Sequence, residues 1–223
     1  CYCLPYSRNY PIDRALLNWQ YVDRLCAQLS TQNRQIHRES FGPLTATMVP
    51  PFMVVVVQVL ELLLAAEQGV ASFAVSFSQT GSMTQDIATA KALRTVACYS
   101  LAKNGFKKTD TRIVFHQWMG AFPDQEVHAE ALIVQGAVTA ALCNADKVII
   151  KTRTEALGIP DAKSNSDAVS MSKYAMDLCE GTIFLNDEVL EEASFIENAA
   201  IFLLDVIADR DNVPLWECVS KAV

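Results

Sequence analysis

The sequence of 223 residues lacks most of the short motifs by which enzyme and binding classes are recognised. No Gly-x-Gly-x-x-Gly follows a predicted strand, so a dinucleotide site of the Rossmann type is not supported. There is no Gly-x-Ser-x-Gly and no Cys–His pair in nucleophile–base form. The basic clusters are short and have no interleaved aromatic residues, which argues against nucleic acid as a partner. The longest apolar run, Phe52–Ala66, is interrupted by Gln58 and Glu61 and is too short to span a bilayer.

The cysteines do not form a recognisable metal or disulfide pattern. There are seven, an odd number, and no Cys-x-x-Cys occurs among them. Cys1 and Cys3 form a Cys-x-Cys, but no second Cys/His pair follows at zinc spacing, so we expect no metal site. No signal peptide is visible. We therefore expect reduced thiols and a cytoplasmic protein that neither spans nor binds a membrane.

What the sequence does contain is a regular alternation of strand-like and helical segments. Apolar strand-like segments begin about 35–40 residues apart, near Gln35, Ala71, Thr111 and Asp146. Helical patterns precede, separate and follow them, at Ile12–Thr31, Pro51–Glu67, Ser82–Asn104, Asp124–Leu142 and Ser164–Cys179. Alternation of this kind predicts parallel βα units in an α/β protein.

The loops favour one of the two folds that such units can build. Four units are compatible with an open doubly wound sheet or with a (β/α)₈ TIM barrel. Each strand is followed by a substantial loop before its helix, which is typical of the active face of a barrel. We therefore predict that residues 1–180 form the C-terminal half of a (β/α)₈ barrel. Residues 181–223 start an appended helical region, in which Asp187 is expected to cap a helix.

The beginning of the chain suggests a fragment. The sequence starts at Cys1 rather than at methionine, and its first residues resemble a loop within a domain. Half of a barrel would leave strand edges and apolar interior exposed. We therefore expect that this chain by itself neither folds stably nor turns over a substrate.

If the barrel prediction holds, polar and aromatic residues at the strand ends share one rim. The segment Val114–Pro123 (VFHQWMGAFP) begins as a strand and ends in a loop, and it carries one of only three histidines, His116. Gln79, Phe41, Lys151 and Glu155 also follow strands. Each has a structural alternative: His116 as a satisfied core histidine, Trp118 as packing, and Lys151 with Glu155 as a surface ion pair. The residues alone do not define a reaction.

Read in order, five segments resemble one family. They are NWQYVDRL (Asn18–Leu25), RESFGPLTATMVPPF (Arg38–Phe52), GSMTQDIA (Gly81–Ala88), VFHQWMGAFP (Val114–Pro123) and KVIIKTRTEALGIP (Lys147–Pro160). Together they resemble the epsilon subunit of adenosylcobalamin-dependent glutamate mutase, also called methylaspartate mutase. The resemblance implies a (β/α)₈ barrel and a radical rearrangement that interconverts L-glutamate and L-threo-3-methylaspartate.

The resemblance also implies site residues and partners. Tyr2 and Tyr6 match positions that contact the substrate. Positions that contact adenosylcobalamin (coenzyme B12) are matched by Pro5, Phe122, Lys151, Glu155 and Ile159, the lysine and the glutamate at its adenosyl group. His116 lies near the substrate and is the candidate catalytic residue. Implied partners are a small cobalamin-binding sigma subunit and a second epsilon subunit, in a heterotetramer. No Asp-x-His-x-x-Gly occurs, so the module that anchors the cobalt is expected elsewhere.

Departures from the family leave two alternatives open. Cys3 stands where the family has a polar residue, and the family's arginines that bind the substrate carboxylates are not in this chain. One alternative is a cofactor-free barrel lyase or aldolase with Lys151 as a Schiff-base amine, although the nearby Glu155 would keep that lysine charged. The other is a non-catalytic remnant that only binds a partner.

Overall fold

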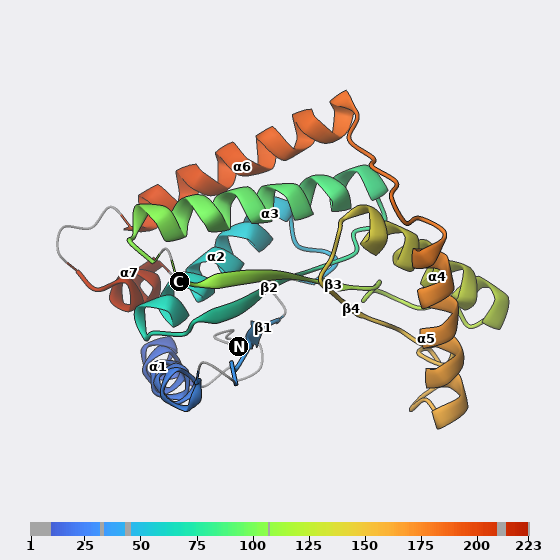
Figure 1. Ribbon diagram of the computed structural model, residues 1–223, viewed down its shortest axis with the longest axis horizontal. Coiled ribbons are helices and arrows are strands. Elements are labelled where there is room, and N and C mark those ends of the chain that lie inside the picture. Colours follow the sequence, from blue (N-terminus) through green and yellow to red (C-terminus); the bar gives the residue numbers. More distant parts are fainter. Residues whose placement is uncertain (1–9, 32–33, 43–45, 107, 209–212, 223) are drawn as a thin grey trace.

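The computed structural model describes residues 10–31, 34–42, 46–106, 108–208 and 213–222 (Figure 1). The described elements alternate as predicted, in the order α1 Ile12–Leu29, β1 Arg38–Ser40, α2 Pro51–Glu67, β2 Ser72–Ser78, α3 Met83–Lys103, β3 Asp110–His116, α4 Glu126–Leu142, β4 Lys147–Ile149, α5 Ala162–Asp177, α6 Asp187–Ala208 and α7 Leu215–Ala222. The prediction of an α/β protein is therefore confirmed. The described residues form four strands, whereas a closed (β/α)₈ barrel has eight, so the barrel remains a prediction.

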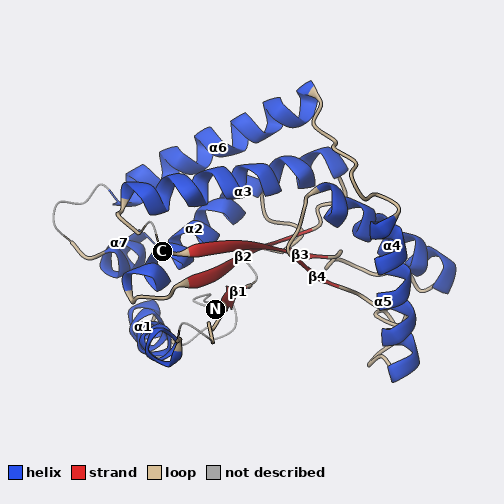
Figure 2. Cartoon of the chain, viewed as in Figure 1, coloured by secondary structure: helices blue, strands red, loops and turns tan. Residues whose placement is uncertain are grey.

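The four strands form one parallel sheet in the order β1-β2-β3-β4 (Figure 2). β2 and β3 pair over their full length, from Ser72 opposite Asp110 to Ser78 opposite His116. Because the order never reverses and parallel crossovers are right-handed, successive helices are delivered to the same face of the sheet. The carboxyl ends of all four strands consequently lie at one edge.

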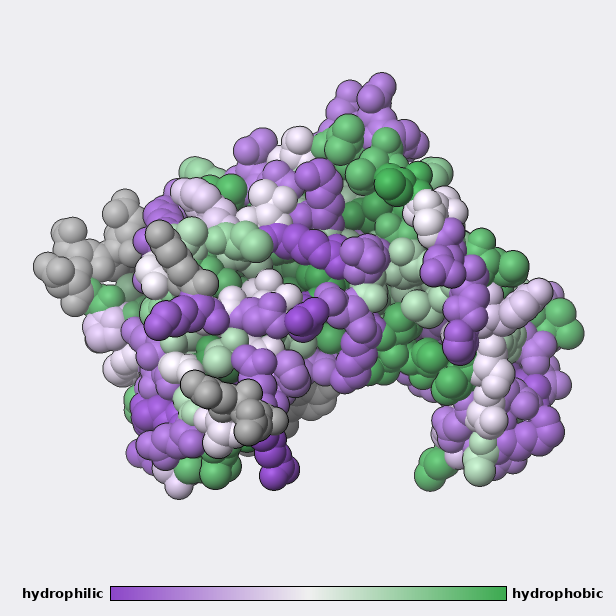
Figure 3. Space-filling view, viewed as in Figure 1, coloured by the Kyte–Doolittle hydropathy of each residue, from purple (hydrophilic) through white to green (hydrophobic). Residues whose placement is uncertain are grey.

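The two faces of the sheet have different residues. Phe73, Val75 and Phe77 of β2 and Ile113 and Phe115 of β3 join the hydrophobic core, together with α2 and α3. The alternate positions of β2 are all small: Ser72, Ala74, Ser76 and Ser78. On this second face the molecule is hollowed between α1 and α5 in the space-filling view (Figure 3). One face thus provides the core, and the other leaves room for polar side chains.

The helices begin where their sequences offer a cap. Ser82 Oγ accepts a hydrogen bond from the Gln85 amide at 3.3 Å, and Asp161 Oδ1 accepts one from the Ser164 amide at 2.7 Å. For α6 the predicted cap was wrong by one residue. Asn186 Oδ1 accepts the Val189 amide at 2.9 Å, and Asp187 is the first helical residue, where its charge favours the helix dipole.

Helix α6 forms an outer layer over α3 and α2 (Figure 1). Its buried residues are spaced by three or four along the helix, at Val189, Ala193, Ile196, Ala200 and Leu204. They belong to the same core cluster as the sheet. The appended helices are therefore continuous with the packing of the βα units.

Candidate functional site

An aromatic pair marks the carboxyl edge of the sheet. The rings of Phe41, directly after β1, and His116, the last residue of β3, are stacked with centroids 3.7 Å apart and planes 14° from parallel. His116 is buried, and its Nε2 has no hydrogen-bond partner among the described residues. Burial, together with the charges of Lys147 and Lys151, lowers the pKa of His116 to about 4. Its imidazole is neutral at physiological pH.

Two glutamines that directly follow strands form buried hydrogen bonds within the protein. Gln79, expected on the rim, is instead fully buried: its Oε1 accepts the Trp118 amide at 3.1 Å and its Nε2 donates to Gln135 of α4. Gln117 Nε2 donates to the Ile133 carbonyl of α4 at 2.9 Å, and its Oε1 accepts the Lys151 amide at 2.9 Å. Each amide thus joins two strand ends to α4, so Gln79 is not available to a ligand.

Helix α4 approaches these glutamines because position 136 is glycine. A Cβ there would lie 2.6 Å from Gln79 Oε1 and 3.1 Å from Gln117 Cγ. A side chain would therefore displace the amides that hold the rim together. The fold requires the absence of a side chain at Gly136, not an unusual backbone angle.

The loop after β2 is held by a buried carboxylate. Asp86, in the first turn of α3, accepts hydrogen bonds at 2.8 Å from both the amide and the hydroxyl of Thr80. Its Oδ2 is buried and has no hydrogen-bond partner among the residues that the structure describes. Burial raises the pKa of Asp86 from 3.8 to about 7, although the hydrogen bonds from Thr80 act in the opposite direction. This residue positions a loop of the rim and was not singled out from the sequence.

Trp118 shapes the loop that follows β3. Its indole Nε1 donates to the Ala121 carbonyl at 2.9 Å, and a Cβ at Gly120 would lie 2.6 Å from its ring. These contacts support the interpretation of Trp118 as a packing residue. Phe122, the predicted cofactor contact in the same loop, is half-buried.

Lys151 and Glu155 form the ion pair that their spacing suggested, just beyond β4. The Lys151 side chain is 19% exposed and that of Glu155 is 36% exposed, so the carboxylate can still accept another partner. Arg153 lies between them in sequence and fastens this loop to α4 through Glu130 at 3.0 Å. Ile159, at the far end of the loop, is 98% exposed.

The other predicted contacts cannot be placed. Tyr2, Cys3, Pro5 and Tyr6 lie outside the described residues. The structure brings His116, Lys151 and Glu155 to the same edge of the sheet, as the sequence predicted.

A second polar cluster lies on the face of the sheet opposite the core. Glu39 of β1 binds Lys147 of β4, with Oε2 and Nζ 2.6 Å apart. The other oxygen, Oε1, lies 3.8 Å from His116 Nε2. Glu39 and Lys147 both lie in segments that resemble the family, but nothing in the sequence indicated that their side chains are in contact.

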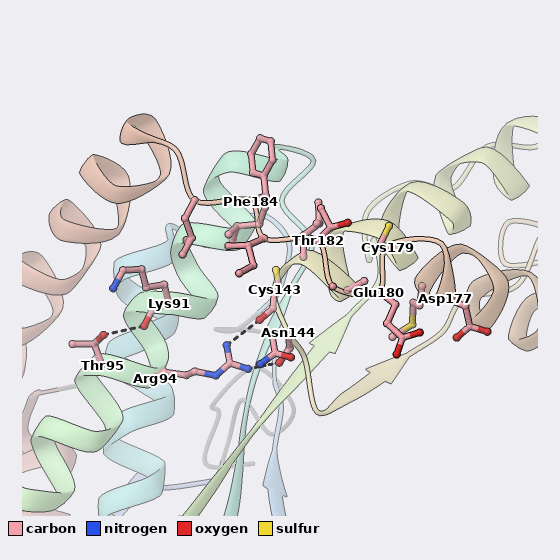
Figure 4. Close-up of a pocket in the computed structure, with 17 residues that line it drawn as sticks. Lys91, Arg94, Thr95, Cys143, Asn144, Asp177, Cys179, Glu180, Thr182 and Phe184 are labelled. Atoms are coloured by element: carbon pink, nitrogen blue, oxygen red, sulfur yellow. Dashed lines mark hydrogen bonds between the residues drawn. The ribbon is translucent and has the colours of Figure 1, made fainter.

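A large cavity lies elsewhere. It has a volume of about 920 Å³ and is lined by α3, the end of α4 and the segment from Met176 to Leu185 (Figure 4). Arg94 Nη1 donates to the Cys143 carbonyl at 2.9 Å, which closes one side. Because Cys143 and Asn144 precede β4, this cavity is remote from the carboxyl edge. None of the predicted site residues lines it.

The remaining expectations concern metals, thiols and membranes. Among the described residues, no three His, Cys, Asp or Glu side chains are grouped so that they could hold a metal ion. The five described cysteines are free. No described helix is both long and apolar enough to cross a bilayer.

Comparison with known proteins identifies the family to which the chain belongs. A family model described as Methylaspartate mutase E chain (MutE) matches residues 1–223. The chain belongs to this family. The resemblance predicted from five segments is therefore confirmed.

Individual relatives carry a consistent name. The glutamate mutase epsilon subunit of Treponema denticola is 39% identical over 222 residues, which cover 99% of this chain and 46% of that protein. Those of Escherichia coli O157:H7 and Halobacterium salinarum are 40% and 37% identical over 79% and 92% of this chain. The alignments cover 37% and 42% of those two proteins. The chain thus spans about half of the length of the curated relatives it matches.

Proposed function

We propose that this chain contributes the carboxyl edge of a (β/α)₈ barrel to an adenosylcobalamin-dependent glutamate mutase, an isomerase that interconverts L-glutamate and L-threo-3-methylaspartate. The observation that carries the proposal is the convergence of Lys151, Glu155 and His116 on one edge of the sheet in a chain of this family. The sequential parallel strand order supports the barrel, because its crossovers leave one face free to enclose a site.

The described residues fit an adenosyl group and an apolar cofactor edge. Glu155 presents a partly exposed carboxylate that can accept hydrogen bonds from sugar hydroxyls, and Lys151 holds it in place. Ile159 offers an exposed apolar side chain on the same loop. When bound, adenosylcobalamin supplies the radical that such a rearrangement requires.

The substrate is assigned to the space over the open face of the sheet. His116, neutral and buried, can exchange a hydrogen bond with an amino-acid substrate without adding a charge. We propose that Tyr2 and Tyr6 contribute substrate contacts, that Pro5 and Phe122 contact the cofactor, and that a small cobalamin-binding sigma subunit and a second epsilon subunit complete the assembly.

A Schiff-base lyase is less well supported. Its nucleophile would be the free amine of Lys151, whereas Lys151 is an ammonium group bound to Glu155. An ammonium ion held by a carboxylate is a poor nucleophile. If the chain only binds a partner, substitutions of the residues at the carboxyl edge should not change the activity of the assembly.

The test uses the natural polypeptide that carries this chain, supplied with the sigma subunit and adenosylcobalamin. We expect Glu155→Gln to raise the KM for adenosylcobalamin about tenfold or more, since a charge-assisted hydrogen bond is worth about 1.5–3 kcal/mol. Glu180→Gln, which removes an exposed carboxylate near the remote cavity, is the matched control. An unchanged KM in Glu155→Gln would contradict the cofactor site.

A further inference from the structure

The ion pair between Glu39 and Lys147 crosses the whole described sheet. The two residues belong to β1 and β4, the first and last strands in the order β1-β2-β3-β4. Three strand spacings amount to about 14 Å in a flat sheet, at about 4.8 Å each. Both side chains are long, and they meet at 2.6 Å over the two strands that lie between them. By register, the residues on this face between the pair are Ala74 and Ser76 of β2 and Arg112 and Val114 of β3.

His116 stands beside this pair with an unused nitrogen. Its Nε2 is buried and lacks a hydrogen-bond partner in the described part of the chain, while Glu39 Oε1 is 3.8 Å away, beyond hydrogen-bonding distance. A buried nitrogen without a partner carries a desolvation penalty and calls for a reason. Phe41, stacked on the other side, fixes the plane of the ring.

We propose that Lys147 is a positioning residue: it holds the Glu39 carboxylate away from His116 and so leaves the imidazole Nε2 free to hydrogen-bond the ligand. This inference rests on the proposed function. Glu39 has two basic neighbours and binds the lysine, at 2.6 Å, rather than the histidine, at 3.8 Å. Without Lys147, the carboxylate would turn to His116, bond its nitrogen and favour its protonated form.

The charged groups around His116 support this balance. Lys147 on β4 and Lys151 in the following loop oppose protonation, and Glu39 on β1 favours it. Lys151 is in turn bound by Glu155. Burial is the largest cause of the low pKa of His116, about 4, and the two lysines add to it. Of the groups named, Lys147 is the one that binds Glu39 directly.

The test measures the titration of His116 in the natural polypeptide, from hydrogen exchange at the imidazole C2 followed by mass spectrometry of its peptide. In Lys147→Gln we expect the pKa of His116 to rise by about 1–3 pH units, as for a carboxylate newly placed beside a histidine. Lys147→Arg keeps the positive charge beside Glu39, so His116 should titrate in this variant as it does in the parent. Lys173→Gln removes an exposed lysine of α5 and is the matched control.

A double variant separates the effect of the Glu39 carboxylate from that of the lost lysine. In Glu39→Gln/Lys147→Gln the rise should be smaller than in Lys147→Gln, because the competing carboxylate is gone. A His116 titration that is the same in Lys147→Gln and the parent would overturn the proposal. So would a shifted titration with no matching shift in the acid limb of kcat/KM, since His116 would then not meet the ligand. Absence of turnover in the parent would instead contradict the proposed function, whatever the titration shows.

Discussion

Replacing Asp86 by asparagine should stabilise the protein at high pH and have little effect at low pH. Asp86 is fully buried, and its two hydrogen bonds from Thr80 are accepted by one oxygen, which an asparagine Oδ1 can replace. The second oxygen is buried and has no hydrogen-bond partner in the described part of the chain, so the ionised form is poorly solvated. The substitution therefore removes a charge without removing the bonds that hold the loop.

The size of the effect follows from the two protonation equilibria. The pKa of Asp86 is about 7 in the folded protein against an ordinary 3.8. The contribution of this residue to folding stability is therefore fully present below pH 3.8 and is lost as the pH rises through about 7. At 1.36 kcal/mol per pH unit, this gap corresponds to about 4 kcal/mol at neutral pH and above. Between pH 5 and pH 8, the advantage of Asp86→Asn should grow by about 3 kcal/mol.

The assay is urea unfolding of parent and variant at pH 5 and pH 8, in the natural polypeptide. Asp13→Asn, in the first turn of α1, is the matched control: it removes an exposed carboxylate near a helix N-terminus and should slightly destabilise at pH 8. If the stability of Asp86→Asn relative to the parent is the same at both pH values, Asp86 does not have a raised pKa in the folded protein. The turnover number should be retained, because the loop is retained.

Two further substitutions test the packing behind the rim. Gly136→Ala should lower the unfolding free energy by about 1–3 kcal/mol despite the better helix propensity of alanine, since its Cβ would meet Gln79 Oε1 at 2.6 Å; thermal unfolding checks this, and stabilisation would contradict it. Ser76→Leu fills the space over which Glu39 and Lys147 meet. It should raise the pKa of His116 as Lys147→Gln does. If hydrogen exchange at the imidazole of His116 is the same as in the parent, Glu39 and Lys147 do not meet over Ser76.

The elements were predictable from the sequence because their signals are local. The alternation of strands and helices and the start of α2 at Pro51 follow from periodicity and from caps. The buried face of α4 did not follow. The apolar residues spaced by three and four along this helix, Val127, Ala131, Val134, Val138 and Ala141, are half-buried or exposed. The buried residues are Ala129, Ile133, Gly136, Ala137, Thr139 and Ala140. This helix is apolar nearly all round, so volume rather than hydropathy decides which side meets the sheet.

The site was predictable only in part, for a similar reason. The order of the strands places His116, Lys151 and Glu155 at one edge, and the family pattern identifies them. The partners of Asp86 and of Gln79, and the pairing of Glu39 with Lys147, depend on which side chains lie close together in three dimensions. No spacing along the chain encodes a contact between β1 and β4.

The most direct test of the proposed function is to identify a product. The natural polypeptide, the sigma subunit and adenosylcobalamin would be incubated with ¹³C-labelled L-glutamate and followed by NMR. We expect a methyl resonance of 3-methylaspartate to appear, to require both the cofactor and the sigma subunit, and to grow more slowly in Glu155→Gln at limiting cofactor. Unchanged glutamate, with all components folded and present, would show that the proposed function is wrong.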